Sequence, residues 1–285
     1  MKRTVSLIAV FAAAAAIATF AQTLGAGAGS LREHATARAA ADSEPQRQAA
    51  EFRWREPLAA GRTIEIRGIN GSVSAEPAAG GEVEVVAVRR ARRSDPEEVR
   101  IEVVRHGDGV LICAVYPNQG GEPNTCELNN SRSQVRDNDT SVNFTVRVPA
   151  GVNFNGRTVN GEVRALELGA DVDAKTVNGA INVSTAGFAR AATVNGSITA
   201  SMGRADWPLG LEFKTVNGSI TLNLPASLSA RVEAKTLNGE ITSDFPMTVT
   251  GSFSRRRLSG TIGGGGDRQL TLETVNGSVQ IRRAG

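Results

Sequence analysis

From Phe52 onward, apolar and polar residues alternate in short runs that Gly, Pro, Asn and Asp separate. The runs at 63–67, 82–85, 100–103 and 142–148 have this period of two, which is typical of strands with one buried face. No longer stretch in this region has the 3.6-residue period of an amphipathic helix. The pattern therefore predicts an all-β body.

A four-residue phrase, Thr-Val-Asn-Gly, recurs through the second half of the chain. Intact copies begin at Thr158, Thr176, Thr193, Thr215 and Thr274, with a near copy at Thr236-Leu237-Asn238-Gly239 and a degenerate one at Leu258-Ser259-Gly260. With Ser259 counted in place of Asn, successive copies lie 17 to 22 residues apart. A recurrence at this interval indicates a structural unit that stacks on copies of itself.

The residues that follow the phrase indicate how the chain continues. With Val as position 0, position +4 is Val or Ile, position +6 is usually apolar or small, and position +5 is polar. In a two-residue hairpin, positions 0 and +4 would face opposite sides, whereas a chain that runs on through a bend places positions 0, +4 and +6 on one side. We therefore expect a single elongated β-solenoid, a β-helix-like repeat with the Val facing the core. A β-meander of hairpins is the alternative.

In this interpretation each Asn-Gly pair forms a corner. Stacked Asn side chains would hydrogen-bond along a ladder, and Gly would supply a positive φ. The expected corners are Asn70-Gly71, Asn160-Gly161, Asn178-Gly179, Asn195-Gly196, Asn217-Gly218, Asn238-Gly239 and Asn276-Gly277.

The first 28 residues predict a secretory signal peptide. Lys2 and Arg3 precede an alanine-rich apolar run, and small residues suited to cleavage follow, so that cleavage is expected after residue 21 or 28. The apolar run has 17 residues, fewer than the ~20 of a usual spanning helix, so no membrane span is expected after cleavage. An uncleaved anchor is the alternative. Residues 29–50 are polar and alanine-rich, which predicts a flexible linker before a β-repeat domain at 51–285.

Cys113 and Cys126 both lie in the part predicted to be exported, and the segment between them is rich in Pro, Gly and Asn. An oxidising compartment favours a disulfide between them, which would fasten this turn-rich loop. The formal net charge of +3 falls to +1 once Lys2 and Arg3 leave with the signal peptide, which argues against a nucleic-acid partner. The sequence thus predicts a disulfide-containing protein of the periplasm or the cell surface.

Three further features together resemble a known family. They are the GINGSV segment at 68–73 with the later TVNGSI and TVNGSV copies, ICAVYP at 112–117, and FTVRVPAGV at 144–152. They resemble a large bacterial domain-of-unknown-function family labelled "putative adhesin", which is similar to the GIN-type auto-transporter adhesin head domain, over roughly residues 52–283. The resemblance implies an exported β-strand-repeat fold and no established activity.

No group of residues predicts catalysis, a cofactor or a metal site. His34 and His106 are the two histidines, and His106 lies in a predicted turn. Asp171 and Asp173 are too few to hold a cation, and the sequence has no phosphate-binding loop or nucleophile elbow. Trp207, in an insertion between repeats, is the one aromatic residue that we consider for partner contact.

We therefore expect a non-enzymatic cell-envelope protein, an adhesin-like module without a cofactor that binds a protein or polysaccharide partner through rows of Thr, Ser and Asn. One alternative is a structural or assembly scaffold, in which the edge of a coil pairs with another chain and gives oligomers. The other is a solenoid carbohydrate-active enzyme, which would need an acidic cluster in one groove.

Overall fold

A computed structural model describes residues 50–118, 120–129, 132–208, 210–254 and 256–284. The predicted signal peptide and the predicted linker up to residue 49 lie outside the described residues. Within the described ranges the chain is all-β, as predicted, apart from one 3-10 turn, η1 (Pro96–Glu98). Asp95 caps this turn by accepting a hydrogen bond from the backbone N–H of Glu97 at 3.0 Å.

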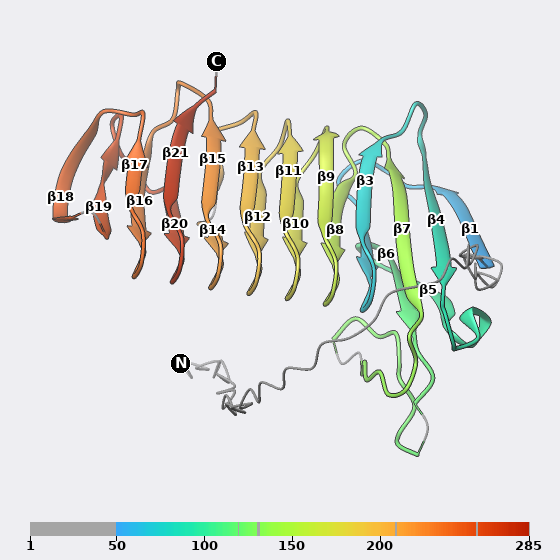
Figure 1. Cartoon of the computed structure of the whole chain (residues 1–285). Coiled ribbons are helices and arrows are strands. Elements are labelled where there is room, and N and C mark those ends of the chain that lie inside the picture. The colour runs from blue at the N-terminus through green and yellow to red at the C-terminus, as the bar shows by residue number, and fades with distance from the viewer. Residues whose placement is uncertain (1–49, 119, 130–131, 209, 255, 285) are drawn as a thin grey trace, which may run out of the picture. The chain divides into compact units, whose positions relative to one another are not determined.

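Two sheets contain the strands of the described residues (Figure 1). In spatial order, the ten-stranded sheet consists of β1 (Ala50–Pro57), β4 (Glu82–Arg90), β7 (Ser141–Val148), β3 (Val73–Pro77), β9 (Val163–Leu168), β11 (Ile181–Thr185), β13 (Ile198–Met202), β15 (Ile220–Leu224), β21 (Val279–Arg283) and β17 (Ile241–Ser243). The eleven-stranded sheet consists of β18 (Met247–Ser254), β19 (Arg257–Ile262), β16 (Ala230–Lys235), β20 (Gln269–Glu273), β14 (Leu211–Lys214), β12 (Ala189–Ala192), β10 (Val172–Lys175), β8 (Asn153–Arg157), β2 (Thr63–Arg67), β6 (Gly109–Val115) and β5 (Arg100–His106). The inward side chains of both sheets share one hydrophobic core.

Most of both sheets is built from repeats, each of which runs from a strand of the eleven-stranded sheet through an Asn-Gly pair to a strand of the ten-stranded sheet. We name each repeat by its Asn. From one end to the other, the repeats are Asn70 (β2–β3), Asn160 (β8–β9), Asn178 (β10–β11), Asn195 (β12–β13), Asn217 (β14–β15), Asn276 (β20–β21) and Asn238 (β16–β17). Equivalent strands pair in parallel with equivalent residues aligned, as Ile181 is with Ile198. This pairing excludes the hairpin alternative for these copies, because the strands of a hairpin are antiparallel.

The last repeat in the sequence is not the last in space. β20 lies between β14 and β16, and β21 lies between β15 and β17, so the Asn276 repeat separates the Asn217 and Asn238 repeats. The degenerate copy around Ser259, which the sequence spacing counted with the repeats, does not form a corner. It lies within β19, which pairs antiparallel with β16 and β18. β18 and β19 thus form a hairpin on the side of β16 that faces away from β14, which we call its outer side. The chain then returns with β20 to the other, inner side, between β16 and β14.

The Val of the repeated phrase faces solvent, which corrects the predicted orientation. The exposed fractions are 36–39% for Val159, Val177, Val194, Val216 and Val275. The Thr one residue earlier is buried instead, and positions +4 and +6 are buried as predicted, for example Ile220 and Leu222, except in the terminal Asn238 repeat, where they are half-buried. The bend begins between Thr and Val, so the alternation of a straight strand cannot be extended across the corner. The buried hydroxyl is satisfied, because Thr193 Oγ1 donates to the Gly179 carbonyl at 3.0 Å.

The corner glycines are needed for close approach of neighbouring repeats, whereas the sequence argument assigned them a positive φ. Of the seven, only Gly71 and Gly277 have a positive φ, of 119° and 159°. A Cβ added to Gly196 would lie 1.9 Å from the Gly179 carbonyl oxygen. Such a contact is far shorter than van der Waals distance, so a side chain there would push the two repeats apart.

Beyond the Asn70 repeat, the sheets continue through β7, β4 and β1 on one side and through β6 and β5 on the other. The segment between β6 and β7 takes the place of an Asn-Gly corner. Within it, the buried Tyr116 hydroxyl donates to the Thr140 carbonyl at 2.8 Å, and burial raises the pKa of Tyr116 to about 12. Cys113 and Cys126 form a disulfide, as predicted, which ties this segment to β6.

Candidate binding face on the ten-stranded sheet

The corner asparagines form a ladder of side-chain amides. Asn160 Nδ2 donates to Asn70 Oδ1 at 2.8 Å, and equivalent bonds of 2.7–2.8 Å continue from repeat to repeat as far as Asn238. Each amide in the middle of the ladder uses one N–H and one lone pair in these bonds, which leaves one donor and one acceptor for a ligand. The ladder therefore presents neutral hydrogen-bonding groups at the strand spacing of about 4.8 Å.

An apolar row runs beside the ladder. Of the eight large hydrophobic side chains that are exposed among the described residues, six occupy the Val position of a repeat. They are Val159, Val177, Val194, Val216, Val275 and Leu237, which we call the corner ridge. Leu237, in the terminal Asn238 repeat, is the most exposed of them at 59%. Contiguous exposed apolar groups are a feature of interaction sites, whereas single exposed hydrophobic residues are common anywhere on a surface.

The outer face of the ten-stranded sheet is uncharged over three consecutive repeats. Side chains alternate between core and solvent along β11, β13 and β15, and the outward ones are all neutral. They are Asn182, Ser184, Thr199, Ser201, Thr221 and Asn223, which we call the uncharged face. Parallel pairing aligns them in two rows across the strands, with Thr199 between Asn182 and Thr221, and Ser201 between Ser184 and Asn223. These rows are the polar +5 positions of the sequence pattern and the positions two residues further on.

Part of the uncharged face is held by internal hydrogen bonds and part is free. Asn223 Nδ2 donates to Ser201 Oγ at 3.0 Å, and Asn182 Nδ2 donates to Glu162 Oε1 at 2.7 Å. The hydroxyls of Thr199 and Thr221 make no hydrogen bond to another residue within the described ranges. The row that contains Thr199 and Thr221 thus keeps donors and acceptors that only solvent or a ligand can satisfy.

The same three repeats are charged on their other side, where β10, β12 and β14 form part of the eleven-stranded sheet. Five of the six outward residues there are Asp173, Lys175, Arg190, Glu212 and Lys214. Ion pairs join Lys175 to Asp173 at 3.3 Å and Lys214 to Glu212 at 2.6 Å. The hydrogen bond with Glu212 raises the pKa of Lys214. Charge is therefore concentrated on one face of these repeats and is missing from the other.

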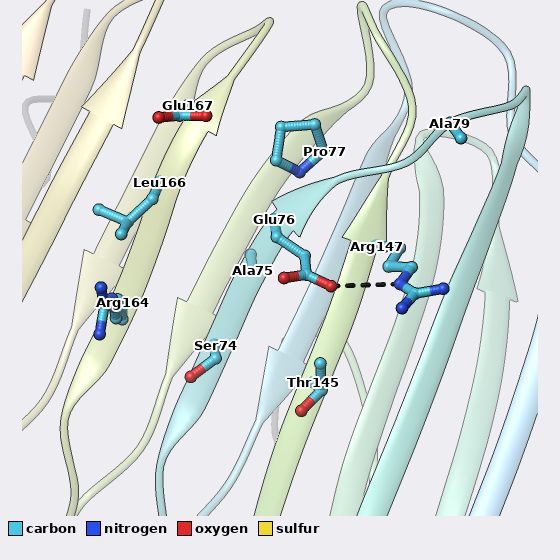
Figure 2. A pocket seen from close by; sticks show the side chains of 10 residues that line it. All are labelled: Ser74, Ala75, Glu76, Pro77, Ala79, Thr145, Arg147, Arg164, Leu166 and Glu167. Carbon is cyan, nitrogen blue, oxygen red and sulfur yellow. Dashed lines mark hydrogen bonds and ion pairs between the residues drawn. The ribbon is translucent and has the colours of Figure 1, made fainter.

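A hollow of about 680 Å³ lies beside the uncharged face (Figure 2). It opens where β3 and β9 stop pairing after Ala75 and Ala165, while Glu76 and Pro77 continue to pair with β7. Figure 2 shows Arg164 and Leu166 of β9 on one side and Glu76 and Pro77 of β3 on the other.

The hollow is adjacent to the uncharged face, because Arg164 of its lining is aligned with Asn182 of the next strand. Arg147 is anchored in the hollow by ion pairs to Glu76 at 3.1 Å and to Glu84 at 3.3 Å. The charged residues of the hollow therefore lie at the β9 end of the uncharged face, and the neutral surface stops there.

Trp207 does not reach the surface, which corrects its assignment as a partner contact. Its side chain is 1% exposed and packs edge-on against Phe188, with the ring centroids 6.4 Å apart. The insertion between β13 and β14 folds back over the core, and burying the large indole ring is more favourable than leaving it in water. Arg204 of the same insertion covers Phe188, 4.7 Å from the ring centroid.

The polar residues considered for chemistry are dispersed. His106 ends β5, and the backbone N–H of Asp108 donates to its Nδ1 at 3.3 Å. Asp171 accepts a hydrogen bond from the backbone N–H of Phe188 at 2.9 Å, and Asp173 pairs with Lys175. Within the described ranges, no three His, Cys, Asp or Glu residues are placed to hold a metal ion. In the same ranges, no helix has the length and apolarity to cross a membrane.

These features define a class of all-β proteins in which strands stack as Asn-Gly repeats. The Toastrack DUF4097 family matches residues 122–282, more than half of the chain, and the chain belongs to this family. Among solved structures, the chain is similar to a putative cell adhesion protein from Clostridium sporogenes, with 11% identity and a TM-score of 0.47, over 83% of this chain and 100% of that one. It is also similar to a putative adhesin from Bacteroides fragilis, with 11% identity and a TM-score of 0.33, over 81% and 97%. No curated protein matches the sequence.

Proposed function

We propose that the protein is an exported, non-enzymatic β-solenoid of the cell envelope that binds a partner across its stacked repeats, in the manner of an adhesin. The observation that carries this proposal is the uncharged face, six aligned neutral side chains beside an exposed apolar ridge, opposite a face on which charges alternate. The charged face favours solubility, whereas the hydroxyls and amides of the uncharged face cost less to desolvate than charges do, when a ligand forms hydrogen bonds with them.

Export is supported by the disulfide between Cys113 and Cys126, because such bonds persist in oxidising compartments. The predicted signal peptide agrees with this location. A test of location is protease treatment of intact cells compared with lysed cells. Cleavage on intact cells would indicate a surface protein, and protection until lysis would indicate an internal envelope compartment.

Binding is tested with the purified, fluorescently labelled protein and envelope fragments prepared from the cells that produce it. We expect saturable binding that excess unlabelled protein displaces. Binding that rises linearly with concentration, or that unlabelled protein does not displace, would contradict the proposed function.

A scaffold role is the second candidate, and one observation favours it. β17 is the edge strand of the ten-stranded sheet, and its Ile241 is half-buried, whereas the equivalent Ile220 and Val279 are 0% exposed. A strand from another chain could cover this edge. Light scattering would then show oligomers whose mass increases with protein concentration, and a constant monomer mass would contradict this role.

A further inference from the structure

We propose that the uncharged face binds an extended, neutral glycan that lies across the strands, along the rows of hydroxyl and amide groups. The inference rests on the proposed function, because it names the partner of the same face. The two sides of the Asn178, Asn195 and Asn217 repeats differ in charge. Both sides consist of stacked parallel strands, so the side chains alone make this difference.

The absence of charge on this face selects against charged polymers. Thr199 lies on its middle strand and Thr221 on the next, and the outward residues aligned with them, Asn182 and Gln280, carry amides. An acidic polymer would have to give up water around its carboxylates or phosphates, and the six positions of the face hold no cation to pair with them, since the nearest aligned arginines, Arg164 and Arg282, lie beyond its two ends. A neutral polyhydroxylated chain carries no such cost, and its hydroxyls both donate and accept, as the side chains of the face do.

A folded protein surface is a poorer match to this face than a glycan. The cores of protein interfaces are enriched in aromatic residues and Met, whereas the exposed large hydrophobic residues, among the side chains whose burial is described, are Val and Leu. The uncharged face itself contains hydroxyls and primary amides. This composition suits a ligand that is bound through many weak, directional hydrogen bonds.

The geometry of the rows sets how such a ligand lies. Aligned residues such as Thr199 and Thr221 are on neighbouring parallel strands, so their side chains recur about every 4.8 Å across the sheet. A glycan chain that crosses the strands meets equivalent hydrogen-bonding groups at each step, with the Asn ladder and the corner ridge along one side. Both ends of this track are charged, at Arg164 beside the hollow and at Arg282 of β21, which is aligned with Asn223.

Affinity is expected to depend on the length of the glycan. Each hydrogen bond replaces one made with water and adds little by itself, and among the side chains whose burial is described no exposed aromatic ring offers stacking. Contacts made by successive sugar units of one chain then act together, because binding of the first unit raises the local concentration of the next. Short oligosaccharides should therefore bind weakly and long chains measurably.

The test uses the purified protein and calorimetric titration with cello-oligosaccharides and malto-oligosaccharides of increasing length, with polygalacturonate as the acidic comparator. Thr221→Lys places a charge within the uncharged face, next to Thr199. Thr271→Lys is the matched control, because Thr271 is an outward, half-buried residue of β20 on the opposite sheet, aligned with Glu212 and Glu233. Thermal melting of both variants confirms that each is folded.

We expect at least one neutral series to bind more tightly with length, with roughly tenfold weaker binding for Thr221→Lys and unchanged binding for Thr271→Lys. Failure of every neutral chain to bind, or equal loss in both variants, would overturn the inference. A change of oligomeric state in Thr221→Lys alone would also overturn it, because the face would then be an interface between copies.

The envelope-binding assay separates this inference from the proposed function. Periodate cleaves the vicinal diols of sugars, and protease removes protein receptors, so each treatment of the envelope fragments removes one class of partner. Loss of binding after periodate supports the glycan. Loss after protease with no effect of periodate would overturn the glycan and leave the proposed function standing, whereas fragments that never bind would overturn both.

Discussion

The spacing of the repeats can be tested by Gly196→Ala. The Cβ of the alanine would lie 1.9 Å from the carbonyl oxygen of Gly179 and 2.4 Å from its carbon, so one backbone must move. Gly196 has no positive φ, and alanine can adopt its conformation, so the effect of the change comes from the contact between repeats.

The expected destabilisation can be estimated from the contacts that the movement disrupts. Overpacking in a tight site costs about 1–3 kcal/mol. Two hydrogen bonds lie next to the clash, Gly196 N–H to the Asn217 carbonyl at 2.9 Å and Asn195 Nδ2 to Asn178 Oδ1 at 2.8 Å, and each contributes about 1 kcal/mol. We therefore expect the free energy of unfolding to fall by about 3–5 kcal/mol.

The assay is urea unfolding followed by circular dichroism, with the change in midpoint and slope used to obtain the free energy. Gly80→Ala is the control, because no atom lies within 4 Å of its added Cβ and its φ is not positive. We expect that variant to match the wild type or to be slightly more stable, by about 0.5 kcal/mol. A free-energy loss below about 1 kcal/mol for Gly196→Ala would refute the close-approach argument, because the repeats would then be able to separate freely.

Three further predictions concern burial, the disulfide and pH. Ile198→Ala, at a fully buried +4 position, should cost about 2–5 kcal/mol in the same unfolding assay, whereas Val194→Ala on the corner ridge should change stability by less than about 1 kcal/mol. Equal effects would contradict the orientation of the corner. Replacement of Cys113 and Cys126 by Ala should cost about 3 kcal/mol, and free-thiol labelling of the unreduced, unfolded protein should find no reactive thiol. The chain has one tyrosine, Tyr116, so its ultraviolet titration should have a midpoint near pH 12 in the folded protein and near pH 10 in denaturant. Because burial raises the pKa, the associated stability is complete below about pH 10 and is lost as the pH rises through about 12; a folded-state midpoint near 10 would refute the buried environment.

The sequence pattern was informative within strands and failed at the bends between them. The alternation after each Asn-Gly pair located Ile220 and Leu222 in the core, because side-chain direction in a strand depends only on local geometry. The same alternation placed Val216 inside, and the structure places it outside, since a corner changes the direction of the chain. The uncharged face was visible as rows of Thr, Ser and Asn, but its contrast with the charged face required knowledge of which strands belong to which sheet.

The sequence by itself determined the all-β class, the position of the Asn-Gly corners and the pairing of Cys113 with Cys126. These features depend on local conformation and on short segments of chain. Only the tertiary structure decided the order of the repeats, in which the C-terminal Asn276 repeat enters between Asn217 and Asn238. The physical reason is that the six repeats after Asn70 present the same Thr and Asn hydrogen bonds to their neighbours, so the pattern fits any stacking order of these repeats. The antiparallel hairpin β18–β19 occupies the outer side of β16, so β20 can pair only on its inner side. This selects one stacking order.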